Sequence, residues 1–146
     1  MNLPTDSLHP RIKLARSSAP ASPKDLLQTR QFFGSVGLQL PEDVAVLFHY
    51  ATELEFLVDK VDYLRIWSPS GILELNDAHA LQAYMNAVAI ADNGGSGVLV
   101  FAEAQDGSGL YMTSFADPDP DELVFVSESL TALLRDGVGL DAVVAP

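Results

Sequence analysis

Apolar runs separated by two glycine-rich turns mark the stretch from Ala87 to Ser114. Glycine accepts the positive φ angles of tight hairpin turns, so this pattern predicts a three-strand antiparallel meander. Residues Val98–Phe101 are all apolar, which is typical of a strand that is covered on both faces or central in its sheet. The predicted strands and turns are Val88–Ala91, Asn93–Gly95, Val98–Ala102, Asp106–Gly109 and Leu110–Thr113.

Helical spacing of apolar residues, with start and stop signals, precedes and follows this meander. Ser22-Pro23-Lys24-Asp25 predicts a helix start, because serine caps helices and proline suits the first turn. Gly37 ends that helix, and Pro41-Glu42-Asp43 opens a second one. A last helix is predicted from Ser127–Ser129 to Gly137. The apolar stripe of the second helix consists of Val44, Leu47, Phe48 and Ala51.

Two further strands and one ambiguous segment complete the pattern. Tyr63–Trp67 is rich in aromatic and β-branched residues, and Leu123–Val126 is a short apolar run, so both predict strands. The segment Ser68–Ala80 fits a hairpin turn followed by a strand at Ile72–Leu75. It fits equally well a helix through Ala80 that begins with a serine cap and a first-turn proline. The residues alone leave these two alternatives open.

Together these elements predict an α+β fold in a single domain, with a central antiparallel sheet of about four to six strands flanked by three or four helices. We expect Val98–Ala102 in the interior of the sheet, with Val44, Leu47 and Phe48 facing it. Residues 1–21 contain three prolines and no helical apolar pattern, which predicts a flexible N-terminal arm before a domain at 22–146. The tail at 138–146 is expected to pack weakly or not at all.

The charge of the chain narrows its possible partners. The 146 residues carry a net charge of −12, but residues 1–40 are net +3 and residues 41–146 are net −15. A field of that sign repels nucleic acid and anionic membranes and attracts basic proteins. The chain has no cysteine, which excludes disulfides, thiolate metal ligands and cysteine nucleophiles. We expect a cytoplasmic protein, because the N-terminal residues lack the apolar core of a secretory signal.

Motifs that would carry chemistry are incomplete. Asp117, Asp119, Asp121 and Glu128 match calcium-loop positions 1, 3, 5 and 12, but Glu122 occupies the position of the turn glycine. The cluster Gly94–Gly97 lacks the lysine and the following helix of a phosphate-binding loop. The three histidines are scattered, and no hydrolase motif occurs. We therefore expect no catalytic residue, no cofactor and no metal.

Five segments occur in order between residues 22 and 137 and together form a recognisable pattern. They are Leu40–Asp43, Tyr63–Pro69, Ile72–Asn76, Ala89–Gly97, and Val126–Leu130 with Leu133-Leu134. This pattern resembles the SUKH superfamily, which includes the yeast Smi/Knr cell-wall regulators and many bacterial immunity proteins. The chain departs from the family at Ala91, where a glycine is common, and at Gly71, where a better helix former is usual.

The resemblance implies an α+β fold with a helix starting at Ser68-Pro69. It also implies a non-catalytic function, the neutralisation of a cognate toxin that is often a nuclease. A regulatory or scaffolding module with a non-toxin intracellular partner is the alternative, and a small hydrolase that uses surface carboxylates is a third. We expect a basic protein partner, no nucleic acid and no membrane. The residues expected to contact the partner are Glu53, Glu55, Asp59 and Asp62 before the first strand, and Phe115, Asp117, Asp119, Asp121 and Glu122 after the meander.

Overall fold

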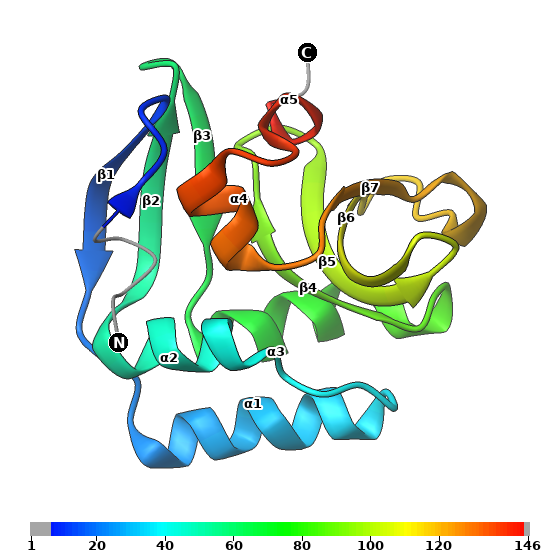
Figure 1. Cartoon of the computed structure of the whole chain (residues 1–146). Coiled ribbons are helices and arrows are strands. Elements are labelled where there is room, and N and C mark those ends of the chain that lie inside the picture. The colour runs from blue at the N-terminus through cyan, green and yellow to red at the C-terminus, as the bar shows by residue number, and fades with distance from the viewer. Residues whose placement is uncertain (1–6, 145–146) are drawn as a thin grey trace.

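The structure is a computed structural model that describes residues 7–144. Its seven strands form one antiparallel sheet in sequence order, and each strand pairs with the next along the chain (Figure 1). The strands are β1 Ile12–Ser18, β2 Thr52–Val58, β3 Asp62–Ile66, β4 Ala87–Asp92, β5 Gly97–Ala104, β6 Gly107–Ser114 and β7 Val124–Ser127. The helices are α1 Pro23–Ser35, α2 Glu42–Tyr50, α3 Pro69–Ala78, α4 Leu130–Asp136 and α5 Leu140–Val143, with short 3-10 turns η2 Leu81–Ala83 and η3 Pro120–Glu122.

The α+β class with a central antiparallel sheet is confirmed, but the predicted strand and helix counts are too low. The prediction missed β1 and β2. Strand β2 alternates buried Leu54, Phe56 and Val58 with outward Glu53 and Glu55, so it is a one-sided strand. The alternation of charged and apolar residues is the usual pattern of a half-buried strand, but it is short here because the apolar Leu57 also lies on the outer face.

The N-terminal arm needs a similar correction. Residues 12–18, placed in a flexible arm by the sequence, form the edge strand β1 and pair with β2. Only Ile12 of this strand is buried. The strand is therefore held mainly by backbone pairing, for which the side chains give little signal. Residues 1–6 of the predicted arm lie outside the described residues.

Serine caps begin three of the helices. The hydroxyls of Ser22, Ser68 and Ser129 accept hydrogen bonds from the backbone amides three residues later, at 3.1, 3.1 and 3.0 Å. The cap at Ser68 shows that the ambiguous segment is helix α3 and not a hairpin. Gly137 ends α4 with a φ of +71°, a conformation that glycine adopts without strain.

The core lies on both sides of the central strands. Val98, Leu99, Val100 and Ala102 of β5 are buried between β4 and β6, as predicted. Helix α2 contributes Val44, Leu47 and Phe48 to the main apolar cluster, which also contains Leu99. The tail was predicted to pack weakly, and this is wrong for α5, because Leu140 and Val143 are buried in the same cluster. Residues 145–146 lie outside the described residues.

Strands β3 and β4 form the weakest pairing within the sheet. They share only two residue pairs, Arg65 with Asp92 and Ile66 with Ala91. Beyond that point helix α3 replaces β3 as the neighbour of β4. The buried amide of Asn76 donates to the carbonyl of Ala89 at 2.8 Å and accepts from its N–H at 2.9 Å. One side chain of α3 thus satisfies a strand residue that has lost its β3 partner.

We call the short junction between β3 and β4 the seam, and in Figure 1 it separates two groups of strands. Strands β1–β3 stand on one side of the view, and β5–β7 curl round on the other. Helices α1 and α2 run along the lower edge of this view, while α4 and α5 lie above, between the two groups of strands. No helix in the part of the chain described here is long and apolar enough to cross a membrane.

Candidate functional site

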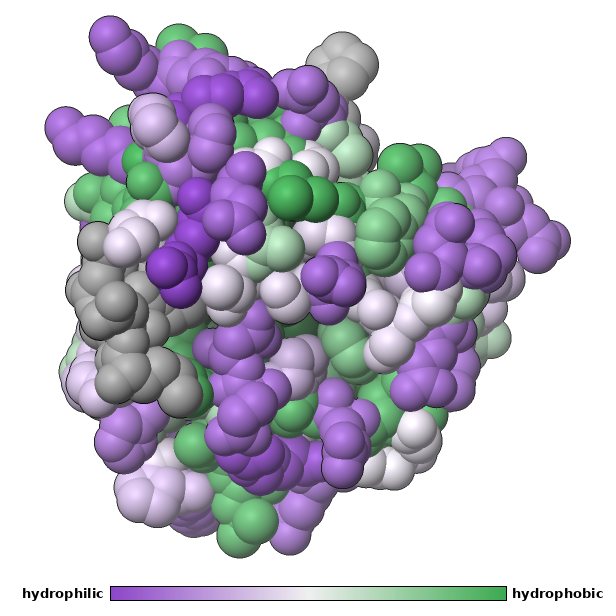
Figure 2. All heavy atoms as spheres, in the orientation of Figure 1, coloured by the Kyte–Doolittle hydropathy of each residue, from purple (hydrophilic) through white to green (hydrophobic). Residues whose placement is uncertain are grey.

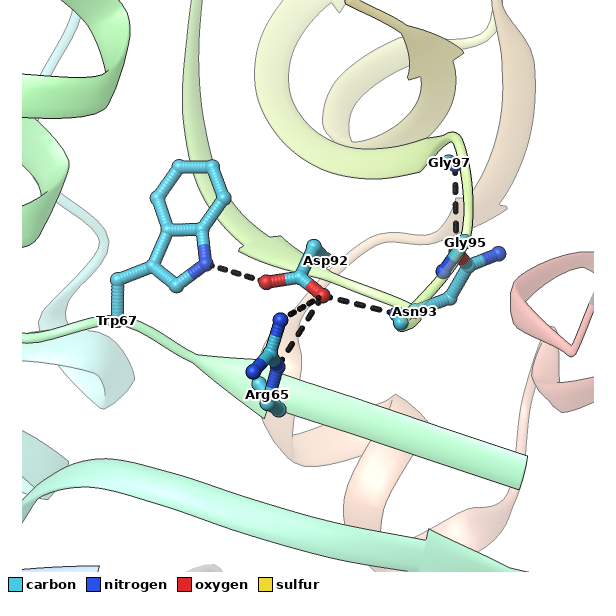
Figure 3. Close-up of polar contacts among 7 residues, drawn as sticks. Arg65, Trp67, Asp92, Asn93, Gly95 and Gly97 are labelled. Carbon is cyan, nitrogen blue, oxygen red and sulfur yellow. Dashed lines mark hydrogen bonds and ion pairs between the residues drawn. The ribbon is translucent and has the colours of Figure 1, made fainter. Parts of the chain in front are cut away.

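The carboxylate of Asp92 is the polar centre of the seam between β3 and β4 (Figure 3). Its Oδ2 accepts a hydrogen bond of 2.7 Å from the indole N–H of Trp67. Its Oδ1 accepts from the Arg65 guanidinium at 3.1 and 3.3 Å and from the backbone N–H of Gly94 at 2.8 Å. Only 16% of the Asp92 side chain is exposed. The network therefore ties the end of β3 to the turn that follows β4.

The glycine turn after Asp92 is held by its own side chains. Asn93 Oδ1 accepts from the amides of Gly95 and Gly97 at 3.0 and 3.2 Å. Its Nδ2 donates to the carbonyl of Val143 at 3.0 Å, which links the turn to α5. A phosphate cradle needs backbone amides that point at the ligand. Here the amides of Gly94, Gly95 and Gly97 donate to protein side chains instead.

An aromatic cleft of about 490 Å³ opens beside this network. The ring of Phe115 lies parallel to that of His79, which follows the last residue of α3, with centroids 4.0 Å apart, and it stacks with Trp67 at 6.0 Å. The other apolar side chains that line the cleft are those of Leu75, Val98 and Ala116. The cleft thus combines side chains from β3, α3, β5 and the segment after β6.

A second hollow shares Arg65, Trp67, Leu75 and Asp92 with the cleft and extends over the outer face of β1–β3. Across this face the strand register aligns Arg16 with Glu55, Glu55 with Arg65, and Arg65 with Asp92. Positive and negative side chains therefore alternate over four strands. Opposite charges on neighbouring strands attract modestly, and this arrangement leaves Glu55 between two cations.

The first group of predicted contact residues is only partly where the sequence placed it. Glu53 and Glu55 lie within strand β2 and not in a loop before the first strand. Both line the second hollow, and Glu53 accepts from the Ser18 hydroxyl at 3.1 Å. Asp59 sits in the β2–β3 turn, and Asp62 begins β3.

Asp59 is engaged within the molecule. Its carboxylate accepts two hydrogen bonds from Arg11, at 2.8 and 2.6 Å. Arg11 also contacts Asp141 of α5 at 3.0 Å. The hydrogen bond from Arg11 lowers the pKa of Asp59 below its ordinary value of 3.8. This ion pair joins the N-terminal segment to the β2–β3 turn and gives Asp59 a structural contact.

The second group lies together in the segment between β6 and β7. This segment projects at the right of Figure 1, and Figure 2 shows a hydrophilic surface there. Asp119 caps the turn η3 by accepting from the N–H of Asp121 at 2.9 Å. Phe115 is half-buried in the aromatic stack, so it is a wall of the cleft and not a free anchor. Asp117 and Glu122 line a third hollow, which shares Ser96 with the cleft.

The acidic side chains of this segment are not neutralised internally. Among residues 7–144, no basic side chain forms an ion pair with Asp117, Asp119, Asp121 or Glu122. Within the same residues, no three His, Asp or Glu side chains are grouped so that they could hold a metal ion. The segment is therefore an acidic rim beside an aromatic cleft.

Arg65, Trp67, His79 and Asp92 form the site, but the sequence did not mark them as contact residues. The SUKH-like pattern could have indicated them, because Arg65 and Trp67 belong to its segment Tyr63–Pro69 and Asp92 belongs to its segment Ala89–Gly97. The structure shows that these segments meet through the hydrogen bonds of Asp92. What the sequence lacked was the pairing of β3 with β4, which brings together residues 25 positions apart in the chain.

No protein-family model matches this chain, and no curated protein matches it. Membership of the SUKH superfamily stays a prediction.

Proposed function

We propose that this chain is a non-catalytic domain that binds and occludes a basic partner protein, of the kind that immunity proteins neutralise. The observation that carries the proposal is the acidic rim, whose carboxylates have no cation partner within residues 7–144, next to an aromatic cleft. Aromatic cores with polar rims are typical of protein interfaces. A nuclease toxin is a fitting partner, because its cleft must attract phosphates and is therefore basic.

The distribution of charge supports this partner class. Residues 41–146 carry a net charge of −15, and self-repulsion of that size opposes the compact state. A basic partner would relieve the repulsion and would be steered toward the acidic rim. The resemblance to the SUKH superfamily implies the same class of function. No covalent step is part of the proposal, since occlusion alone would inactivate the toxin.

The test is affinity capture from extracts of the native host with three baits, in about 50 mM salt so that surface charges are weakly screened. The baits are the wild type, a rim variant with D117N, D119N, D121N and E122Q, and a control variant with E103Q, D106N, E128Q and D136N. The control changes four exposed acids that line none of the three hollows. Both variants carry a net charge of −8 in place of −12, so they separate local from global charge effects.

We expect the wild type and the control variant to retain the same basic protein, and the rim variant to retain at least about tenfold less of it. Expressed alone, that protein should stop growth, and coexpression with the wild-type chain should restore it. Equal capture by all three baits would contradict the proposal. A captured protein that is harmless when expressed alone would favour the regulatory or scaffolding alternative.

A further inference from the structure

The aromatic cleft has a composition that selects among partner side chains. Its walls are the rings of Trp67 and Phe115 together with Leu75 and Val98. The volume of about 490 Å³ is within the usual range for pockets that bind small ligands. A single large side chain of a partner would fit into a hollow of this size.

The main polar group of the cleft is already satisfied. Asp92 accepts four hydrogen bonds, from Trp67, from two nitrogens of Arg65 and from Gly94. A cation entering the centre would compete with Arg65 for that carboxylate, and an entering polar group would gain little in return for its lost hydration. An apolar side chain is therefore favoured at the centre of the cleft.

The stacked rings of the cleft favour an aromatic side chain of the partner over an aliphatic one. Phe115 stacks with His79 and with Trp67, at interplanar angles of 5° and 21°. These rings offer their edges and the faces that are not already stacked to another ring, and aromatic pairs gain stabilisation beyond the area that they bury. A ring entering beside Phe115 would extend a stack that already exists.

The charged residues around the cleft favour a particular charge on the partner segment that would present the aromatic side chain. The residues that line the cleft and its two neighbouring hollows include five acids, Glu53, Glu55, Asp92, Asp117 and Glu122, against two arginines, Arg16 and Arg65. Of these five, only Asp92 forms an ion pair within residues 7–144. Basic residues on either side of the inserted ring would meet this excess of negative charge.

We propose that the cleft takes one aromatic side chain of the partner, presented on a basic segment whose cations lie against the acidic residues around it. This inference rests on the proposed function and names what that partner inserts. A second copy of this chain is a poor occupant, because two molecules of net charge −12 repel each other.

Trp67 gives a direct readout, because it is the only tryptophan in the chain. Its single indole N–H resonance can be followed in ¹⁵N–¹H spectra of the full chain during titration with blocked tripeptides. The probes are Lys-Phe-Lys, Lys-Ala-Lys and Glu-Phe-Glu. We expect a saturable shift with Lys-Phe-Lys, with a dissociation constant of about 1–10 mM, and binding at least about tenfold weaker for the other two peptides.

A pair of matched variants localises the binding. Phe115→Leu removes the ring from the cleft, whereas Phe125→Leu removes a half-exposed ring that lines none of the three hollows. Thermal melts establish that both variants fold. We expect Phe115→Leu to weaken Lys-Phe-Lys binding at least about fivefold and Phe125→Leu to leave it unchanged.

Three results would overturn the inference: no saturable shift with Lys-Phe-Lys, binding of Lys-Ala-Lys or Glu-Phe-Glu as tight as that of Lys-Phe-Lys, or equal effects of the two leucine variants. The peptides replace the natural partner, so such a result leaves the acidic-rim proposal standing. If Lys-Phe-Lys binds as expected but no basic protein is captured, the proposed function fails and the specificity of the cleft stands.

Discussion

Strands β1–β3 and strands β4–β6 belong to one sheet but are buried differently. In β2 and β3, the inner residues Leu54, Phe56, Leu64 and Ile66 are buried, while the outer face carries Glu53, Glu55 and Arg65. In β4–β6, both faces are covered: Ile90 and Leu99 belong to the main cluster, and Ala89, Val98 and Val100 to a second one. The first half presents charge to the solvent, and the second half is an apolar support.

The site lies where these halves meet. Only two residue pairs join β3 to β4, against five between β2 and β3 and eight between β5 and β6. The backbone N–H of Trp67 donates to the carbonyl of Ile90 at 3.0 Å, and Asp92 adds hydrogen bonds from Arg65 and Trp67. Beyond this point Asn76 of α3 bonds to Ala89. Junctions between packed units are common places for ligand pockets. The cleft therefore lies at the point where the sheet changes from one buried face to two.

We expect the largest effect from replacing leucine by alanine in β5, compared with the same replacement in β2. Leu99→Ala removes a fully buried side chain from β5, and Leu57→Ala removes a half-buried one from the outer face of β2. We expect losses in the free energy of unfolding of about 3–4 kcal/mol and about 1 kcal/mol, because cavity cost depends on burial. Urea denaturation measures both. Equal losses would show that the two halves are not buried differently.

The next prediction concerns the side chain that replaces a strand partner. Asn76→Ala leaves the N–H and carbonyl of Ala89 without their hydrogen bonds from α3. We expect a loss of about 2–3 kcal/mol in the free energy of unfolding, because these groups are buried. Asn86→Ala, at an exposed position, is the control and should cost less than about 0.5 kcal/mol. Similar losses for the two variants would contradict a stabilising role of the hydrogen bonds between Asn76 and Ala89.

Asp92 is predicted to have a somewhat smaller effect. Asp92→Ala leaves the Trp67 indole N–H and the Gly94 amide unpaired, with an expected loss of about 2 kcal/mol. Asp92→Asn keeps an acceptor for the indole and should cost roughly half as much. Urea denaturation gives both values, and the indole N–H resonance should move in both variants. An unchanged resonance in Asp92→Ala would contradict the hydrogen bond.

The smallest predicted effect depends on pH. The pKa of Asp59 is lowered in the folded state by Arg11, so this contact contributes stability above the ordinary pKa of 3.8 and loses it as the pH falls through the folded value. Asp59→Asn should therefore lower the urea midpoint at pH 7 and not at about pH 2. Asp62→Asn, whose carboxylate forms no ion pair within residues 7–144, is the control. A constant difference between wild type and Asp59→Asn at both pH values would contradict the shift.

Local patterns in the sequence were sufficient for the elements that carry a strong local signal. Serine caps at Ser22 and Ser129 and the apolar run Val98–Phe101 predicted two helices and a central strand correctly. Strand β1 was missed because an edge strand with one buried side chain has little apolar pattern. The site was missed for a different reason. Asp92 and Trp67 meet through strand pairing. No local sequence rule singles out Asp92 as a site residue among the 20 acidic residues of the chain.

Association kinetics measure whether the acidic rim directs binding to a basic partner. The on-rate for the captured partner is measured at low and high salt for the wild type, the rim variant and the control variant of equal net charge. We expect the wild-type on-rate to fall at least about tenfold with salt, and the rim variant alone to be slow at low salt and nearly insensitive to salt. On-rates that ignore both salt and the rim substitutions would contradict the claim.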